Sequence, residues 1–298
     1  MSVPAALSVD LEFFTHLPAY RRARGVTDER GVGVEGVRDL LVAFGDADAT
    51  GTFFAVGEIA DDRPDLLRRV ADGGHEVGSH THTHQHLSEL DPDERRGELA
   101  RSRDRLEAVT GTDVTGFRAP SFDMAGGHFA SLAETGYAYD SSVVPCRSIP
   151  GWYGGEHDTT RPSPATAVDP DAPDGLGEVP VSVMPGLRLP LTGTWIRFFG
   201  VRYTILGMRL LARRGVPPVL YVHPWELVDL PAVAGVPRRV YVRTGSYMRR
   251  AVRRILAEPF EFVPVRTLAE SVGESASGRA ATQGATATDD PSEVDGEP

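Results

Sequence analysis

Apolar and polar residues alternate along the chain in blocks that predict strands and helices in turn. Short apolar runs typical of strands lie at residues 7–12, 50–56, 219–223 and 260–264. Longer amphipathic stretches predict helices at residues 34–44, 63–72, 92–109, 127–135, 201–214 and 246–257. This alternation favours an α/β fold with a parallel sheet, either open or closed into a barrel.

The clearest predicted helix boundary is Asp91-Pro92-Asp93-Glu94. Asp91 can cap the helix, Pro92 suits its first position, and Glu94 can reach back to complete a capping box. We therefore expect a helix that begins at Pro92 and ends near Val109.

Two segments depart from the alternation. Residues 141–185 are rich in Pro, Gly and Asp, which is typical of an active-site cover or a disordered excursion. Trp152 and Tyr153 favour a long loop over the site, because they can pack against it. Residues 273–298 hold almost no large apolar side chain, so we expect a disordered acidic tail. The folded part is then one domain over residues 1–272.

The composition restricts the classes of site and partner. Cys146 is the only cysteine, which excludes an internal disulfide framework and a cysteine-based zinc finger. A bound metal would need His, Asp and Glu ligands. The chain carries 31 basic residues, all Arg, against 42 acidic ones, and a net charge of −11 argues against binding to nucleic acid. No signal peptide and no apolar run of membrane-spanning length is apparent, which predicts a cytoplasmic protein.

The charge is unevenly distributed. Residues 186–257 contain thirteen Arg but only Glu226 and Asp229 as acids, a local charge of +11. This segment also mixes Arg with aromatic residues, so it could contact an anionic membrane or a lipid-linked glycan from the cytoplasmic side. The alternative is that its apolar residues are core and its Arg side chains form a solvated face.

Two carboxylates share one face of the first predicted strand. Side chains alternate in a strand, so Ser8, Asp10 and Glu12 lie on one side and the apolar residues between them on the other. Both faces of a parallel strand are normally buried, so a face with two carboxylates must open onto something polar. The alternative is an edge strand with a solvated face.

Five of the nine His residues lie between residues 75 and 86. Imidazole is the commonest neutral metal ligand, and two His four residues apart on a helical turn can chelate one ion. Spacing alone allows either His80 with His84 or His82 with His86. A fortuitous His-rich loop is the alternative.

An Arg and a His follow two further predicted strands. Arg118 stands beside a Pro-stiffened turn in Gly116-Phe-Arg-Ala-Pro-Ser-Phe122, and His223 ends the apolar run before Pro-Trp-Glu226. The position of His223 suits a catalytic acid. Taken singly, Arg118 could equally be a structural ion-pair partner and His223 a core histidine.

Together and in this order, the segments over about residues 5–270 resemble the polysaccharide deacetylase family, the NodB-homology carbohydrate esterases. Ser8 to Glu12 is similar to the spaced Asp-x-Asp/Glu form of the first motif. Gly74 to Ser79 matches the lead-in to the second, which selects His80 and His84. Arg118-Ala119-Pro120 matches the third motif and His223 the fifth. No segment clearly matches the fourth motif, for which Asp140 is a candidate. His-Pro-Trp-Glu resembles the subgroup found beside exopolysaccharide gene clusters.

The resemblance implies a distorted (β/α) barrel with parallel strands and outer helices. It also implies one divalent metal ion, zinc with Fe, Co or Ni as alternatives, held by Glu12, His80 and His84. Asp10 would be the general base, Arg118 would orient Asp10, and His223 would be the general acid. A backbone N–H near Ser121 or Phe122 would stabilise the oxyanion. The substrate-binding candidates are Pro120, Ser121, Phe122 and Trp225.

The expected function is a metal-dependent hydrolase that removes N-acetyl groups from an N-acetylated sugar or polysaccharide precursor. One alternative is an allantoinase-like hydrolase of another non-peptide C–N bond. A second is a barrel that binds glycans without catalysis, although binding alone needs neither a base nor an acid.

Overall fold

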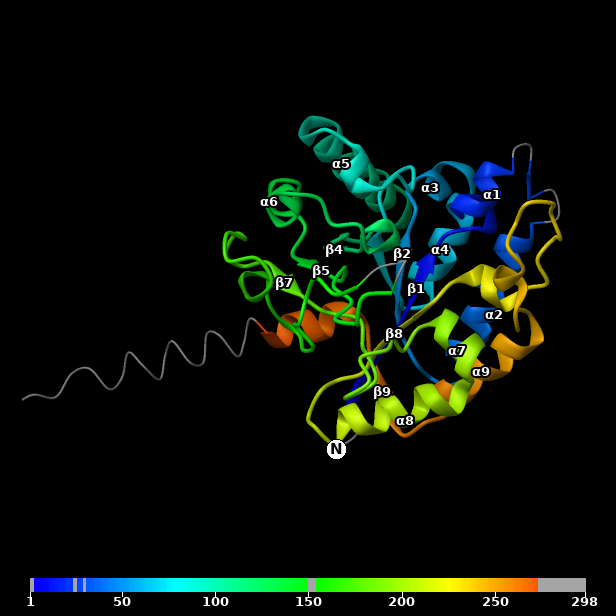
Figure 1. Cartoon of the computed structure of the whole chain (residues 1–298). Helices are drawn as coiled ribbons and strands as arrows, with labels where there is room; N and C mark the ends of the chain where they lie inside the picture. Colours follow the sequence, from blue (N-terminus) through cyan, green and yellow to red (C-terminus); the bar gives the residue numbers. More distant parts are fainter. Residues whose placement is uncertain (1–2, 24–25, 29–30, 150–153, 273–298) are drawn as a thin grey trace, which may run out of the picture.

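The protein is built around one curled sheet surrounded by helices (Figure 1). The computed structural model describes residues 3–23, 26–28, 31–149 and 154–272. Within them the strands run in the order β6-β7-β5-β4-β3-β2-β1-β8, and β9 also pairs with β1. The strands are β1 (Val3–Leu11), β2 (Thr52–Ala55), β3 (Glu76–Ser79), β4 (Gly116–Phe117), β5 (Tyr139–Asp140), β6 (Ser163–Pro164), β7 (Gly177–Glu178), β8 (Val219–Val222) and β9 (Phe260–Phe262).

The described helices cover the outside of this sheet (Figure 1). The α-helices are α1 (Pro18–Arg22), α2 (Val32–Asp46), α3 (Glu58–Asp62), α4 (Pro64–Asp72), α5 (Pro92–Thr110), α6 (His128–Glu134), α7 (Gly193–Phe199), α8 (Val201–Ala212) and α9 (Ser246–Leu256). Residues 265–272 are also helical. Short 3-10 turns are η1 (Phe14–His16), η2 (Leu87–Glu89), η3 (Pro120–Phe122), η4 (Ala165–Ala167), η5 (Pro224–Leu227) and η6 (Arg238–Tyr241). No helix in these ranges combines the length and the apolar character needed to cross a membrane.

The local signals place the longest helix where the sequence predicts it. In α5 the Asp91 carboxylate accepts hydrogen bonds from the backbone N–H groups of Asp93 and Glu94, both at 2.9 Å. The Glu94 carboxylate accepts the N–H of Asp91 at 3.0 Å, which completes the capping box. Gly111 ends the helix with a positive φ of 69°, a conformation that glycine adopts without strain. The expected start at Pro92 is confirmed.

Strand β1 is buried on both faces. It pairs in parallel with β2 on one side and β8 on the other, so it is not an edge strand. Its apolar face, including Leu7, Val9 and Leu11, belongs to the main hydrophobic core. Its polar face, with Ser8 and Asp10, is also buried and faces the inside of the curled sheet. This polar face needs partners there, because buried carboxylates are stable only when they are paired.

The sheet forms a distorted barrel that is not closed by regular strands. All strand pairs are parallel except β6 with β7. The segment after β7 crosses to β8, where the N–H of Ser182 donates to the carbonyl of Val219 at 2.8 Å. Thr192 then forms a parallel bridge with Tyr221. The expected distorted (β/α) barrel of parallel strands and outer helices is confirmed, with an irregular seam between β7 and β8.

Residues 141–185, predicted as a long loop over the site, contain short regular elements. Their described part adds β6, η4 and β7 to the sheet, and β7 pairs with β5 through Tyr139 opposite Gly177 and Asp140 opposite Glu178. Strands of two residues are too short to show periodicity, so the sequence pattern could not reveal them. Trp152 and Tyr153, and the acidic tail at 273–298, lie outside the described residues.

Candidate active site

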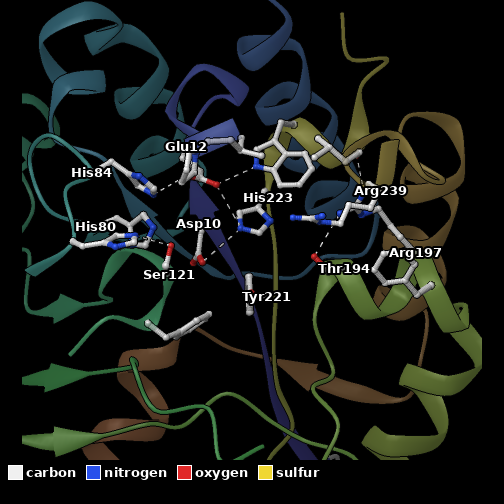
Figure 2. A pocket seen from close by; sticks show the side chains of 17 residues that line it. Asp10, Glu12, His80, His84, Ser121, Thr194, Arg197, Tyr221, His223 and Arg239 are labelled. Carbon is white, nitrogen blue, oxygen red and sulfur yellow. Dashed lines mark hydrogen bonds and ion pairs between the residues drawn. The ribbon is translucent and has the colours of Figure 1, made fainter. Parts of the chain in front are cut away.

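The chemically reactive side chains follow the carboxyl ends of parallel strands. Asp10 lies near the end of β1 and Glu12 just after it, His80 follows β3, Arg118 follows β4, and His223 follows β8. Because these strands are parallel, their carboxyl ends lie at one end of the barrel. A cavity of about 370 Å³ opens there, lined among others by Asp10, Glu12, His80, His84 and His223 (Figure 2).

Glu12, His80 and His84 have the arrangement of a metal site. All three are buried, and one ligand atom of each lies within 4.8 Å of the others. Glu12 Oε2 is 2.6 Å from His84 Nε2, yet this buried oxygen has no hydrogen-bond partner with acceptable geometry among the described residues. His80 Nδ1 lies 2.7 Å from the carbonyl oxygen of Arg118, which leaves Nε2 for a ligand. The residues therefore fit a divalent cation.

The two His ligands are brought together by an irregular turn. Thr81 and His84 have positive φ values of 59° and 58°, so the helical turn expected for this pair is wrong. The turn is fixed to the start of α3, where the N–H groups of Gly57 and Glu58 donate to the carbonyls of Thr81 and His82 at 2.9 Å each. Backbone bonds to a neighbouring loop are not encoded in local spacing.

The other His pair allowed by spacing points elsewhere. His82 Nε2 lies 3.6 Å from Asp61 Oδ2 on the outer side, and His86 Nε2 lies 3.1 Å from Ser121 Oγ at the cavity. The three-residue cluster with ligand geometry includes His80 and His84 and neither of these two.

Glu12 and His80 are kept unprotonated at neutral pH by shifts of their pKa values, and metal binding requires this state. Burial alone would raise the pKa of Glu12, but the imidazoles of His84, His223 and His80 lower it well below its usual range. Burial lowers the pKa of His80 to about 4. Trp225 contributes to the position of Glu12, because its indole N–H donates to Glu12 Oε1 at 3.1 Å.

Asp10 is fixed by a fully buried arginine. Arg118 NH1 donates to Asp10 Oδ1 at 2.6 Å and to Ser8 Oγ at 2.8 Å. Its other groups donate to the carbonyl and hydroxyl oxygens of Ser141, at 3.0 and 2.8 Å. Arg118 thus ties β1 to the end of β5 and holds Asp10 in one orientation, with Oδ2 on the side of His223 at 4.0 Å.

His223 belongs to a buried chain of charges. Its Nδ1 lies 3.4 Å from Glu226 Oε2, and Arg197 Nε donates to Glu226 Oε1 at 2.8 Å. Burial by itself would lower the pKa of His223, but Glu226, Glu12 and Asp10 raise it above its usual value. Nε2 faces the cavity, 3.6 Å from Glu12 Oε1. A protonated imidazole in this place can give a proton to a bound molecule.

The turn after Arg118 lies at the cavity wall. Ser121 and Phe122 line the cavity with positive φ values of 55° and 60°, whereas Pro120 is buried and does not line it. The N–H of Phe122 already donates to the carbonyl of Ala119 at 3.0 Å. Of the two N–H groups expected to face an oxyanion, that of Ser121 is the one without a described acceptor.

Asp140 lies behind the cavity and does not line it. Its carboxylate contacts His128 Nε2 at 2.9 Å and accepts the hydroxyl of Ser142 at 2.6 Å. Ser142 Oγ in turn accepts the N–H of Ala119 at 2.8 Å. Asp140 therefore supports the turn after Arg118, and the carboxylate beside Nδ1 of His223 is that of Glu226.

Glu226, Arg197 and Arg239 contact or line the site but are not among the site residues predicted from the sequence. Glu226 carries a usable signal, because it is one of two acids in the segment 186–257 and follows His223 by three residues. Arg197 and Arg239 carry no such signal, since nothing in the sequence distinguishes them from the other Arg residues of that segment.

Two family models divide the chain at the end of β5. Residues 27–139 match the model for polysaccharide deacetylase, and residues 141–270 match a domain of unknown function (DUF3473). Residues 27–139 therefore belong to the polysaccharide deacetylase family. His80, His84 and Arg118 fall in the deacetylase match and His223 in the second match, whereas Asp10 and Glu12 precede both.

A peptidoglycan-N-acetylglucosamine deacetylase from Bacillus cereus is 28% identical over 102 residues, which are 34% of this chain and 37% of that protein. The match thus spans little more than a third of this relative's length. A solved Mycobacterium smegmatis protein assigned to the polysaccharide deacetylases has a TM-score of 0.68 at 24% identity, covering 92% of this chain and 91% of that chain. A solved allantoinase has a TM-score of 0.62 at 16% identity, covering 90% and 89%. At these identities the structures share the fold, and the fold does not distinguish the two activities.

Proposed function

We propose that this member of the polysaccharide deacetylase family removes the N-acetyl group from an N-acetylated sugar in a metal-dependent reaction. One observation carries the proposal: a buried Glu-His-His cluster, a carboxylate fixed by Arg118 and a histidine of raised pKa share one cavity. The name of the Bacillus cereus relative supports a 2-acetamido sugar as the substrate unit.

Glu12, His80 and His84 would hold the cation, and the donor set of two imidazoles and a carboxylate suits zinc, with Fe, Co or Ni as alternatives. When bound, the cation supplies Lewis acidity towards the acetyl carbonyl and the attacking water. Trp225 and the carbonyl of Arg118 keep two of the ligands in place.

The chain's own residues would move the protons. Asp10 takes a proton from the water as its oxygen bonds to the acetyl carbon, and Arg118 keeps Asp10 oriented for this step. The N–H of Ser121 can donate to the oxyanion. As the C–N bond breaks, His223 gives its proton to the leaving nitrogen. Acetate and a free amine result, and Asp10 and His223 exchange protons with solvent afterwards.

The test is the release of acetate from N-acetylglucosamine oligomers, nucleotide sugars and lipid-linked sugars, with a chelator and with metals added back. We expect His80→Ala to lose the bound metal, measured by elemental analysis, and at least about a thousandfold in kcat/KM, because one of three ligands is gone. His82→Gln is the matched control, since His82 lies in the same turn and outside the cluster.

A His80→Ala variant that keeps full activity without metal would overturn the metal-dependent scheme. Acetate release from none of the sugars, together with hydrolysis of allantoin, would assign the site to the allantoinase-like alternative. Glycan binding without any hydrolysis would assign it to a binding module. The cytoplasmic location and the exopolysaccharide setting stay predictions.

A further inference from the structure

The cavity has a cationic wall on the far side of His223 from the metal-ligand cluster. Thr194, Arg197 and Arg239 line this wall, whereas His80 and His84 lie on the opposite side (Figure 2). Arg197 comes from α7 and Arg239 from η6, so two separate segments bring a guanidinium to the same place. The reaction proposed above uses neither group in its chemical steps.

Arg239 is available for a ligand. Its side chain is exposed at the cavity and forms no ion pair with a carboxylate of the described residues. Its neighbour Arg238 and the nearby Arg243 also lack a described carboxylate partner. Glu226 is the buried acid nearest in sequence, and its carboxylate is already held by Arg197.

Arg197 presents one free edge to the same wall. Its Nε bonds to Glu226 and its NH1 donates to the carbonyl of Val240 at 2.8 Å. Its NH2 makes only a long contact of 3.5 Å with the hydroxyl of Thr194. The guanidinium is buried, so a ligand that replaces this weak contact meets a preformed donor of fixed direction.

We infer that this wall binds an anionic group, phosphoryl or carboxylate, on the sugar that carries the N-acetyl group. The inference rests on the proposed deacetylation, because that reaction places the acetyl carbon at the metal-ligand cluster and the amide nitrogen at His223. In a 2-acetamido sugar the nitrogen is on C2, so a substituent on C1 or C3 lies just beyond it. A line from the metal-ligand cluster past His223 leads to Thr194, Arg197 and Arg239.

The repulsive groups favour the same orientation. Asp10 and Glu12 lie on the metal-ligand side of His223, and an anion placed beside them would meet two carboxylates (Figure 2). Arg239 and the outer edge of Arg197 supply the only guanidinium groups that line the cavity in the described part of the chain. Opposite charges at the two ends of one cavity thus fix which way an anionic sugar enters.

The test compares sugars that differ in one charged group. Isothermal titration measures binding of N-acetylglucosamine, N-acetylglucosamine 1-phosphate and N-acetylmuramic acid to the Asp10→Asn variant, in which turnover does not interfere. We expect at least about tenfold tighter binding of one anionic sugar, as one charge-assisted hydrogen bond supplies. Adding Arg239→Gln removes the preference. Adding Arg238→Gln keeps it, because Arg238 lies in the same turn without lining the cavity.

Each outcome decides the inference. A preference for the 1-phosphate assigns a phosphoryl group, and a preference for N-acetylmuramic acid assigns a carboxylate. Equal binding of all three sugars, or a preference that survives Arg239→Gln, overturns the inference. Because binding is measured without turnover, anion recognition by Arg239 stands even if no acetate is released from any sugar, and that result would instead reject the proposed deacetylation.

Discussion

Glu178 is a buried carboxyl group that the protein keeps protonated. Burial and the adjacent carboxylate of Asp140 raise the pKa of Glu178 well above its ordinary value of 4.5. The two carboxyls are hydrogen-bonded, and Asp140 stays ionised because His128 contacts it. One proton shared in this way avoids two buried negative charges behind the cavity.

This proton makes stability depend on pH. A carboxyl whose folded-state pKa is raised contributes its full stability below its unfolded pKa, and that contribution is lost as the pH rises towards the folded-state pKa. Glu178→Gln keeps an acceptor for the N–H of Val143, now at 3.1 Å, and a donor towards Asp140, but it cannot ionise. We expect the free energy of unfolding of this variant, relative to that of the wild type, to increase by up to about 1.4 kcal/mol per pH unit above pH 4.5.

Denaturant unfolding at pH 5 and pH 8 measures this difference. Glu35→Gln, a change at an exposed carboxylate on α2, is the control and should show no comparable trend. If Glu178→Gln and the wild type differ by the same amount at both pH values, Glu178 is not the protonated member of the pair.

At the scale of elements, Arg118 joins strands that no turn connects. It follows β4, and its guanidinium reaches Ser8 and Asp10 on β1 and Ser141 after β5. Arg118→Lys keeps the charge opposite Asp10 but cannot reach all of these oxygens, because an ammonium lacks the planar fork. Buried oxygens left without a donor should lower the free energy of unfolding by about 3 kcal/mol.

Chemical denaturation and acetate release, measured together, check this expectation. Arg95→Lys is the matched control, since Arg95 is also buried but donates only to the backbone carbonyls of Gly126 and Leu90. We expect the control to lose less stability and to keep its activity. Equal losses in both variants would show that Arg118 acts only as a buried cation.

The elements also show what the sequence could predict. The cap of α5, the burial of β1 and the strand ends that carry Asp10 and His223 follow from local pattern, since each depends on residues close in the chain. The turn that joins His80 and His84 depends on bonds to residues 57 and 58, and the position of Asp140 depends on β7. The sequence could also have predicted Glu226 as the partner of His223, because Glu226 follows His223 by only three residues.

At the scale of the whole molecule, ion pairs within the protein neutralise part of the positive charge of the segment 186–257. Five Arg residues of the segment 186–257 pair with carboxylates, four of them with acids outside it: Arg188 with Asp158, Arg197 with Glu226, Arg209 with Glu258, Arg249 with Asp39 and Arg253 with Asp46. The acidic and basic parts of the chain thus meet where α9 packs on α2. Most of these pairs are exposed and contribute little stability each.

The segment 186–257 also carries exposed apolar side chains. Five of the six exposed large apolar side chains of the described residues lie in the same segment: Leu187, Phe198, Phe199, Leu206 and Val242. Phe199 and Leu206 are 53% and 54% exposed, and Arg202 lies between them in sequence, exposed and without a described carboxylate partner. Phe198 is also exposed and lines the cavity, so this surface adjoins the site. Apolar and cationic side chains side by side are typical of contact with an anionic membrane.

Sedimentation with vesicles tests that contact. We expect more protein to sediment with vesicles containing an anionic lipid than with neutral ones, because each Arg near the surface contributes about 1 kcal/mol. Replacing Phe199 and Leu206 by Ser should reduce sedimentation with the anionic vesicles. Val42→Ser is the control, since Val42 is 52% exposed on α2, outside the segment. Equal sedimentation with both kinds of vesicle would show that the Arg residues form a solvated face and do not bind the membrane. Arg239 would then recognise the anion of a substrate that is free in solution.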